Sequence, residues 1–387
     1  MKNTQNIILT MEYKRLNLLI VPTNQCNLRC KYCYHSTYGY DKDKLSLKQV
    51  EDILEKASDS FNKVNIFWHG GEPLVMGIDF YKKILDIQSK ISAKKQCSFS
   101  NKLQTNGTLV NEEWIDFFIK NNFGIGVSFD GPNNDDFRQQ GDLVLSNIKL
   151  MKSKGLSIGV ISVITQKSLD DLIKLYNWFN SNKISCKFNP MFICGSAKDD
   201  YALDKDVYAE KMLALFKYWM HDKNCNIRIS QFDELFFYFT KQKYNHVCCH
   251  SSCLYHYLGI TPNGDIYPCA RAWTKDYVLG NISTINNIED AYNSQNYNNL
   301  VEQAIKRRNS CMETCKFSDF CKGGCNNIAL IETGLENNGG WTCYVTKKLC
   351  EGVSNILKDI KDHASTIDFN NYNPRLVPFI ADFLKQK

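Results

Sequence analysis

Three closely spaced cysteines constrain this chain more than any other feature. Cys26, Cys30 and Cys33 have C-x3-C-x2-C spacing and follow an apolar run, 16–21, that predicts a buried strand. Three thiolates on one short loop can hold three irons of a 4Fe–4S cube and leave the fourth iron without a protein ligand. An open iron lets a small molecule coordinate, whereas a structural metal site is closed. The alternative is a zinc knuckle with His35 as the fourth ligand.

The other cysteines are also clustered. The chain has 17 cysteines in 387 residues, with four within 248–269 and four within 311–325. No apolar run is long enough to span a membrane, and the first residues have too short an apolar core for a secretion signal, so we expect a cytoplasmic protein. In a reducing compartment, clustered cysteines indicate metal ligation rather than disulfides. The net charge of +6 is mild, and we expect neither nucleic acid nor a membrane as partner.

Short apolar runs alternate with amphipathic helical patterns over residues 16–190. Six β/α repeats predict a parallel sheet with right-handed crossovers, and six are too few to close an eight-stranded barrel. The fold class is therefore α/β, with a partial (β/α)6 TIM-type barrel. The predicted strands are Leu16–Val21, Val64–Trp68, Phe99–Leu103, Gly124–Phe129, Ile158–Ile164 and Cys186–Asn189. The predicted helices lie around 46–59, 79–92, 111–121, 142–154 and 169–182, with Ser46 as a cap and Gly155 as a stop.

Four unusual segments follow the first four predicted strands. They are the cysteine loop, Gly70-Gly71-Glu72-Pro73, Gln104-Thr105-Asn106-Gly107 and Ser128-Phe129-Asp130-Gly131-Pro132. In parallel α/β folds the loops at the carboxyl ends of the strands converge and carry the chemistry. We therefore expect all four segments on one rim of the barrel.

The side chains of these segments suit a small polar ligand. Adjacent glycines at 70 and 71 let the backbone approach closely, and their carbonyls, with Glu72, can accept hydrogen bonds from an ammonium group. Asn106 and Ser128 suit a carboxylate or ribose, and Arg138 can pair with a carboxylate. The alternatives are a plain glycine–proline turn, two turn-capping residues and a surface arginine.

The second half carries a cysteine array. Helices rich in aromatic residues are expected over 200–245 as a bridge, and Thr261–Asp265 predicts a hairpin turn. The array can bind iron–sulfur clusters or zinc. It comprises Cys253, Cys269, Cys311, Cys315, Cys321, Cys325 and Cys343, with His246, His250 and His256 nearby as non-ligands. Cys97, Cys186, Cys194, Cys225 and Cys350 lack such spacing and are expected to be buried thiols.

These motifs resemble the radical S-adenosylmethionine (SAM) superfamily, including the aromatic Tyr32 before the third cysteine. The resemblance implies that Cys26, Cys30 and Cys33 hold a 4Fe–4S cluster whose open iron chelates SAM. Electron transfer from the reduced cluster then breaks SAM, and a 5′-deoxyadenosyl radical abstracts hydrogen from the substrate. The implied SAM-binding residues are Tyr32, Gly70, Gly71, Glu72, Asn106, Ser128 and Arg138, with the Gly-Gly-Glu-Pro segment on the methionyl amino group.

The array in the second half resembles the SPASM extension of radical SAM enzymes, a cysteine-rich domain with a β-hairpin and short helices. The resemblance implies two auxiliary 4Fe–4S clusters, making three in all. One would take Cys253, Cys269, Cys325 and an upstream cysteine, Cys249 in preference to Cys248. The other would take Cys311, Cys315, Cys321 and Cys343. One departure is that three residues, not the usual two, separate Cys311 from Cys315.

From Leu16 to Cys343 the chain is similar to anaerobic sulfatase-maturating enzymes and related peptide maturases. Sulfatase maturases carry an aspartate, the proposed catalytic base, directly after the cysteine that closes the hairpin. Here that residue is Ala270, followed by Arg271, and alanine cannot accept a proton. The base is therefore unknown. We rank oxidative modification of a ribosomal peptide (crosslink, thioether or cyclophane) first and formylglycine formation from Cys or Ser second. The alternative from another class is a non-enzymatic zinc-binding interaction module.

The expected domains are a radical SAM partial barrel (12–225), bridging helices with the SPASM domain (226–350) and a C-terminal helical tail (351–387). The implied partners are a peptide or protein substrate and an electron donor such as flavodoxin or ferredoxin. The segment before Leu16 is too short for a peptide-recognition domain, so a leader peptide is expected to bind elsewhere or to a separate protein.

Overall fold

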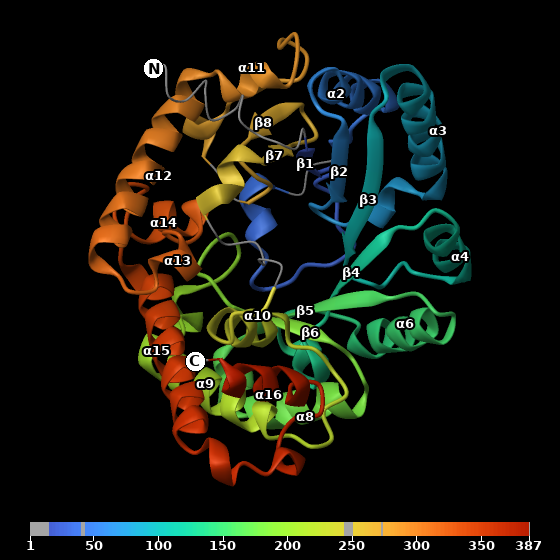
Figure 1. The fold of residues 1–387 in the computed structure, drawn as a ribbon. Coiled ribbons are helices and arrows are strands. Elements are labelled where there is room, and N and C mark those ends of the chain that lie inside the picture. The colour runs from blue at the N-terminus through green and yellow to red at the C-terminus, as the bar shows by residue number, and fades with distance from the viewer. Residues whose placement is uncertain (1–14, 40–42, 244–250, 272–273, 387) are drawn as a thin grey trace.

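Six parallel strands form the first part of a sheet, in the order β6-β5-β4-β3-β2-β1 (Figure 1). The structure is a computed structural model that describes residues 15–39, 43–243, 251–271 and 274–386. The strand ends differ from those predicted by no more than two residues, and the partial barrel is confirmed. The strands are β1 Arg15–Ile20, β2 Lys63–Trp68, β3 Ser98–Thr105, β4 Gly124–Ser128, β5 Ile158–Ile164 and β6 Cys186–Pro190.

The connecting helices lie on the outside of this sheet (Figure 1). Ser46 caps α2 through a capping box with Gln49, and Gly155 follows the end of α6 with φ +83°, as predicted. The helix expected over 169–182 is broken in two, because the Thr165 side chain caps a separate short helix before it. The helices are α2 Leu47–Ser60, α3 Ile78–Lys95, α4 Glu112–Lys120, α5 Asn134–Phe137, α6 Gly141–Ser153, α7 Gln166–Asp170 and α8 Leu172–Ser181.

The predicted hairpin extends the sheet of the barrel. Strand β7 (Tyr257–Ile260) pairs in parallel with β1, and β8 (Asp265–Tyr267) and β9 (Gly280–Asn281) continue the sheet antiparallel. A single nine-stranded sheet, β6-β5-β4-β3-β2-β1-β7-β8-β9, therefore runs through both halves of the chain. The strand that precedes the first cysteine loop is thus hydrogen-bonded to β7, the first strand of the hairpin whose second strand, β8, precedes Cys269.

Helices make up the rest of the second half. The aromatic residues of α9 and α10 form core, with Phe216, Trp219 and Phe232 fully buried against one another. The helices are α9 Lys205–Met220, α10 Ser230–Phe239, α11 Glu289–Tyr292, α12 Gln295–Thr314, α13 Ser318–Cys321, α14 Asn326–Glu332, α15 Gly340–Asp362 and α16 Val377–Lys385. Helix α15 continues through residue 350, so the domain boundary expected there lies inside a helix. None of the helices in the described ranges is long and apolar enough to cross a membrane.

Candidate functional site

The loop after β2 lies directly against the cysteine loop after β1. The amide of Gly71 donates to the carbonyl of Thr23 at 3.1 Å, and the amide of Glu72 donates to the carbonyl of Gln25 at 2.8 Å. A Cβ on Gly71 would lie 2.2 Å from that Gln25 oxygen, and one on Gly70, whose φ is +124°, would meet a side-chain atom at 2.5 Å. The two glycines are therefore required for this close contact.

Glu72 is fully buried and joins the ends of β2 and β3. Its carboxylate accepts hydrogen bonds from Leu74 N (3.0 Å), Thr105 Oγ1 (2.8 Å) and Asn106 N (2.7 Å). Burial raises the pKa of Glu72 to about 7, although these hydrogen bonds oppose the shift. The carboxylate thus holds the protein's own strand ends together, and its predicted contact with an ammonium group stays a prediction.

Asn106 connects β3 to the cysteine loop. Its Nδ2 donates to Asn27 Oδ1 at 2.8 Å and lies 3.8 Å from the sulfur of Cys26, which also accepts from Leu28 N at 3.4 Å. Hydrogen bonds to a ligand sulfur are one way in which proteins set the potential of an iron–sulfur cluster. Ser128, at the end of β4, accepts from the Gln104 side chain at 2.9 Å.

Tyr32, Asp130 and Arg138 form a charged cluster on the same rim. The Tyr32 hydroxyl donates to Asp130, Arg138 Nε donates to the Tyr32 hydroxyl at 2.6 Å, and Nε lies 3.5 Å from Asp130 Oδ2. Burial raises the pKa of the Cys30 thiol, and the charge of Arg138 opposes that shift. In the described residues the terminal nitrogens of Arg138 make no hydrogen bond. The four predicted segments are thus brought together on one rim.

The rim suits a thiolate-bound cluster. Burial raises the pKa of Cys26 to about 11, and smaller increases come from Glu72 and from the neighbouring Cys30 and Cys33. Metal binding would release the protons of the three thiols. The charge of Arg138 and the hydrogen-bond donors near the Cys26 sulfur favour the deprotonated, thiolate form. The thiolates of a cubane each bind a different iron. Among the described residues, no three His, Cys, Asp or Glu side chains surround a single ion. His35, the alternative zinc ligand, hydrogen-bonds to Asn24 Oδ1 through Nε2 at 3.1 Å.

His69, at the end of β2, is a rim residue that the sequence analysis missed. Its Nδ1 accepts from the amide of Gly70 at 2.7 Å and lies 3.2 Å from the Tyr34 hydroxyl. Burial, with a smaller effect of the Arg271 charge, lowers the pKa of His69 to about 4. The rim therefore carries a neutral imidazole, and the segment after Cys269 places a positive charge near it. The available signal was its position next to the two glycines.

Replacing His69 with glutamine is expected to flatten the pH dependence of stability of the metal-free chain between about pH 4 and 6.5. A base whose pKa is lower in the folded chain binds fewer protons when folded, so stability falls as the pH decreases from 6.5 towards 4. Over that interval the wild type should lose about 1–3 kcal/mol more than His69→Gln. Urea unfolding at fixed pH values measures the difference, and parallel pH profiles would contradict the lowered pKa.

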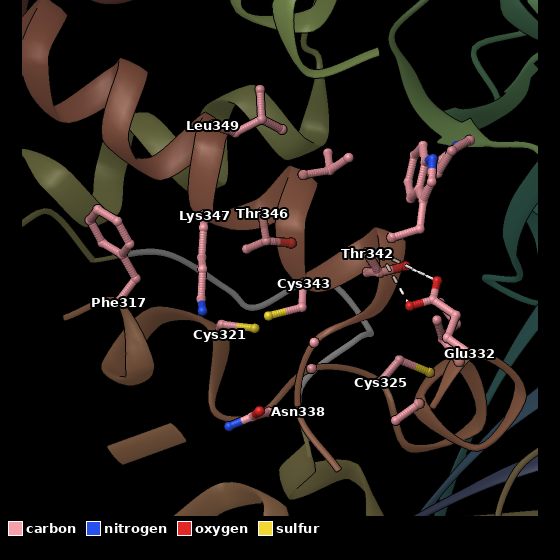
Figure 2. Close-up of a pocket in the computed structure, with 18 of the residues that line it drawn as sticks. Phe317, Cys321, Cys325, Glu332, Asn338, Thr342, Cys343, Thr346, Lys347 and Leu349 are labelled. Atoms are coloured by element: carbon pink, nitrogen blue, oxygen red, sulfur yellow. Dashed lines mark hydrogen bonds between the residues drawn. The ribbon is translucent and has the colours of Figure 1, made fainter. Parts of the chain in front are cut away.

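The structure brings together the four predicted ligands of one auxiliary cluster. Burial raises the pKa of Cys321 to about 12, and the neighbouring thiols of Cys343, Cys311 and Cys315 raise it further. These four cysteines line a cavity of about 240 Å³, and the sulfurs of Cys321 and Cys343 point towards each other (Figure 2). The extra residue between Cys311 and Cys315 does not separate them, because Cys311 lies in the last turn of α12 and Cys315 caps it.

The other auxiliary set is described in part. Asn326, directly after Cys325, has its Nδ2 3.8 Å from the sulfur of Cys253. The backbone of Cys269 packs so closely on β7 that a Cβ on Gly259 would lie 2.4 Å from it. The candidates for the fourth ligand, Cys248 and Cys249, lie outside the described residues, as do His246 and His250.

Four of the five unassigned cysteines are buried as predicted: Cys97, Cys186, Cys225 and Cys350. For Cys194 the prediction was wrong, because this residue is partly exposed. It lies in the loop after β6, where Ser196 N donates to the carbonyl of Cys33 at 3.1 Å. Its place is therefore beside the rim rather than in the core.

Comparison with known proteins gives two family matches, one over the first cysteine loop and one over the second group of cysteines as far as Cys321. Residues 20–179 match the Radical SAM superfamily, and residues 248–322 match SPASM, an iron–sulfur cluster-binding domain. This chain is a radical SAM enzyme with a SPASM domain. Its cofactors are accordingly SAM and iron–sulfur clusters, with clusters in both the radical SAM part and the SPASM part.

The relatives of this radical SAM enzyme include sulfatase maturases. The cysteine-type anaerobic sulfatase-maturating enzyme of Clostridium perfringens is 27% identical over 364 residues, covering 87% of this chain and 95% of the relative. The serine-type enzyme of Bacteroides thetaiotaomicron is 25% identical over 410 residues, covering 92% and 98%.

Solved structures share the fold. Native anSMEcpe with bound AdoMet and Cp18Cys peptide has a TM-score of 0.75 at 24% identity, covering 89% of this chain and 99% of that one. Streptococcus suis SuiB bound to precursor peptide SuiA has a TM-score of 0.62 at 19% identity, covering 88% and 78%.

Proposed function

We propose that this radical SAM enzyme oxidatively modifies a ribosomally made peptide, forming a crosslink, thioether or cyclophane. The observation that carries the proposal is Ala270, which follows Cys269 where sulfatase maturases are expected to have an aspartate. Ala270 is buried and has no proton-accepting group, and the next residue, Arg271, is positively charged. Solved structures of anSMEcpe and SuiB hold peptides, which supports a peptide as the substrate class here.

Cys26, Cys30 and Cys33 hold the radical SAM cluster in this proposal. When bound, that cluster supplies the electron that cleaves SAM to a 5′-deoxyadenosyl radical. Arg138 offers its terminal nitrogens to a carboxylate, and Tyr32 and Asp130 hold the guanidinium in place. The methionyl group of SAM supplies that carboxylate.

The remaining cofactor residues act in two ways. Gly70 and Gly71, after β2, present backbone carbonyls at the rim. Ser128, at the end of β4, offers a hydroxyl there. Glu72 and Asn106 position these loops through their hydrogen bonds to the protein. The two auxiliary clusters take the cysteines assigned above, with Cys249 as the fourth ligand of the Cys253 set. An electron donor such as flavodoxin or ferredoxin reduces the enzyme.

Metal analysis and product analysis test the proposal. Anaerobically purified protein should be brown and contain about twelve irons per chain if three cubanes form. Co-expression with the short reading frame beside the gene should lower the mass of the encoded peptide by about two mass units, because oxidative coupling removes two hydrogens. A colourless zinc protein, or an unmodified peptide alongside active SAM cleavage, would contradict it.

Formylglycine formation on a sulfatase is the second candidate. It is favoured by the names of the relatives, which include both cysteine-type and serine-type sulfatase maturases. The same enzyme incubated with a sulfatase peptide decides between the two. An aldehyde on a Cys or Ser side chain of that peptide supports this second function, and it would require a proton acceptor other than Ala270.

A further inference from the structure

The guanidinium of Arg307, on α12, is buried between the two sets of SPASM cysteines. Only 1% of the residue is exposed. Its Nε donates to the carbonyl of Gly323 at 2.9 Å, Nη1 donates to the carbonyl of Leu335, and Nη2 donates to Asn326 Oδ1. All three acceptors are neutral, so these hydrogen bonds leave the positive charge unbalanced.

No carboxylate balances this charge in the described part of the chain, where no Asp or Glu oxygen lies within ion-pair distance of Arg307. A buried charge without an opposite charge is strongly destabilising. The titratable groups whose charge acts on Arg307 are cysteine thiols. Burial lowers its pKa, and nearby Cys311, Cys325, Cys321 and Cys253 raise it, in that order.

Each proposed auxiliary cluster takes two of these four sulfurs. Cys311 and Cys321 belong to one ligand set, and Cys253 and Cys325 belong to the other. Cys311 follows Arg307 by four residues on α12 and so lies on the same face of that helix. One positive charge is therefore shared by two sites that become negative when thiolates and clusters are in place.

The hydrogen bonds of Arg307 also hold the backbone that carries the ligands. Gly323 stands between Cys321 and Cys325, and its φ of +85° turns the chain there. Asn326 contacts Arg307 through its oxygen and lies 3.8 Å from the Cys253 sulfur through its nitrogen. The planar guanidinium fork explains how one side chain stays fixed between the two sets.

We propose that Arg307 is a positioning residue whose positive charge stabilises the reduced state of both auxiliary clusters. The proposal rests on the proposed function, which assigns clusters to these cysteines. Reduction adds one electron, and hence one negative charge, to a cluster. A fixed positive charge nearby, in a site shielded from water, makes that addition more favourable and raises the reduction potential.

The test uses the full-length chain with Cys26, Cys30 and Cys33 replaced by alanine, so that only the auxiliary clusters contribute. In this background Arg307→Gln removes the charge, Arg307→Lys keeps it, and Arg308→Gln is the matched control. Arg308 is the next residue of the same helix and is partly exposed. Iron is counted after anaerobic reconstitution, and the potentials are measured by redox titration followed by electron paramagnetic resonance.

With about eight irons bound, both potentials should fall in Arg307→Gln. The expected change in the reduction equilibrium is at least about tenfold, which is about 59 mV for a one-electron couple. The potentials of Arg307→Lys should fall much less, and those of Arg308→Gln should not change.

Unchanged potentials at full iron content overturn this inference and leave the proposed function standing. If Arg307→Gln loses iron, the lysine variant decides the question. If Arg307→Lys keeps its iron, the positive charge is what the clusters need, and the inference is supported. If both variants lose iron, the inference is overturned. A background chain that binds no iron contradicts the proposed function instead.

Discussion

Replacing Cys30 with alanine is expected to remove about four irons per chain and to lower SAM cleavage by at least about a thousandfold. Two remaining thiolates on the loop cannot hold a cube at the rim, and Cys30 is the ligand that faces Arg138. Iron assays and the yield of 5′-deoxyadenosine with a strong reductant measure the two effects. The auxiliary iron should be retained.

Cys97→Ala is the matched control for that variant. Cys97 is as buried as a core residue and is not among the proposed ligands. Its removal should cost about 1–2 kcal/mol of stability and should change neither the iron content nor SAM cleavage. Cleavage at the wild-type rate in Cys30→Ala would contradict the assignment of the radical SAM cluster to this loop.

Replacing Gly71 with alanine is expected to destabilise the metal-free chain by about 3 kcal/mol and to abolish SAM cleavage. The added Cβ would lie 2.2 Å from the carbonyl oxygen of Gln25 and 2.6 Å from that of Asn24. Both are backbone atoms, so relief requires the loops to separate and the hydrogen bond from Glu72 N to Gln25 to break. Urea unfolding and the iron content measure the outcome.

Gly159→Ala on β5 is the control, because a Cβ there has nothing within 4 Å. It should change stability by no more than about 0.5 kcal/mol and leave the iron content unchanged. If Gly71→Ala matched it in both measurements, the close packing of the two loops would not be needed to hold the cysteines.

The barrel could be predicted because most of its strands contain short apolar runs, which can be recognised without knowing which strands pair. The hairpin around Gly264 was also predictable from its turn residues. Its pairing with β1 was not, because nothing in Tyr257–Ile260 specifies a parallel neighbour more than 200 residues earlier in the chain. The C-terminal helical tail was expected from residue 351, but helix α15 begins at Gly340, where Glu332 accepts hydrogen bonds from Thr342. A contact between two helices, here α14 and α15, leaves no periodic pattern of apolar residues in the sequence.

The cysteine loop and the Gly-Gly-Glu-Pro segment could be recognised in the sequence because their spacing restricts the chemistry. His69 was missed because its only signal is its position next to the two glycines, and a single histidine after an apolar strand otherwise carries no pattern. Arg307 was missed for the same reason, since an arginine in a polar helix is normally solvated. Their surroundings depend on which segments meet in three dimensions. Glu72 shows a related limit, because its residue type suggested a ligand contact while its burial assigns it three bonds to the protein.

The continuous sheet has a consequence for electron transfer. Since β7 is bonded to β1 along its length, the radical-forming cysteines and the hairpin cysteine Cys269 are parts of one rigid framework. A continuous sheet resists hinge-like motion between the two halves, so we expect the tunnelling distance between their clusters to change little during turnover.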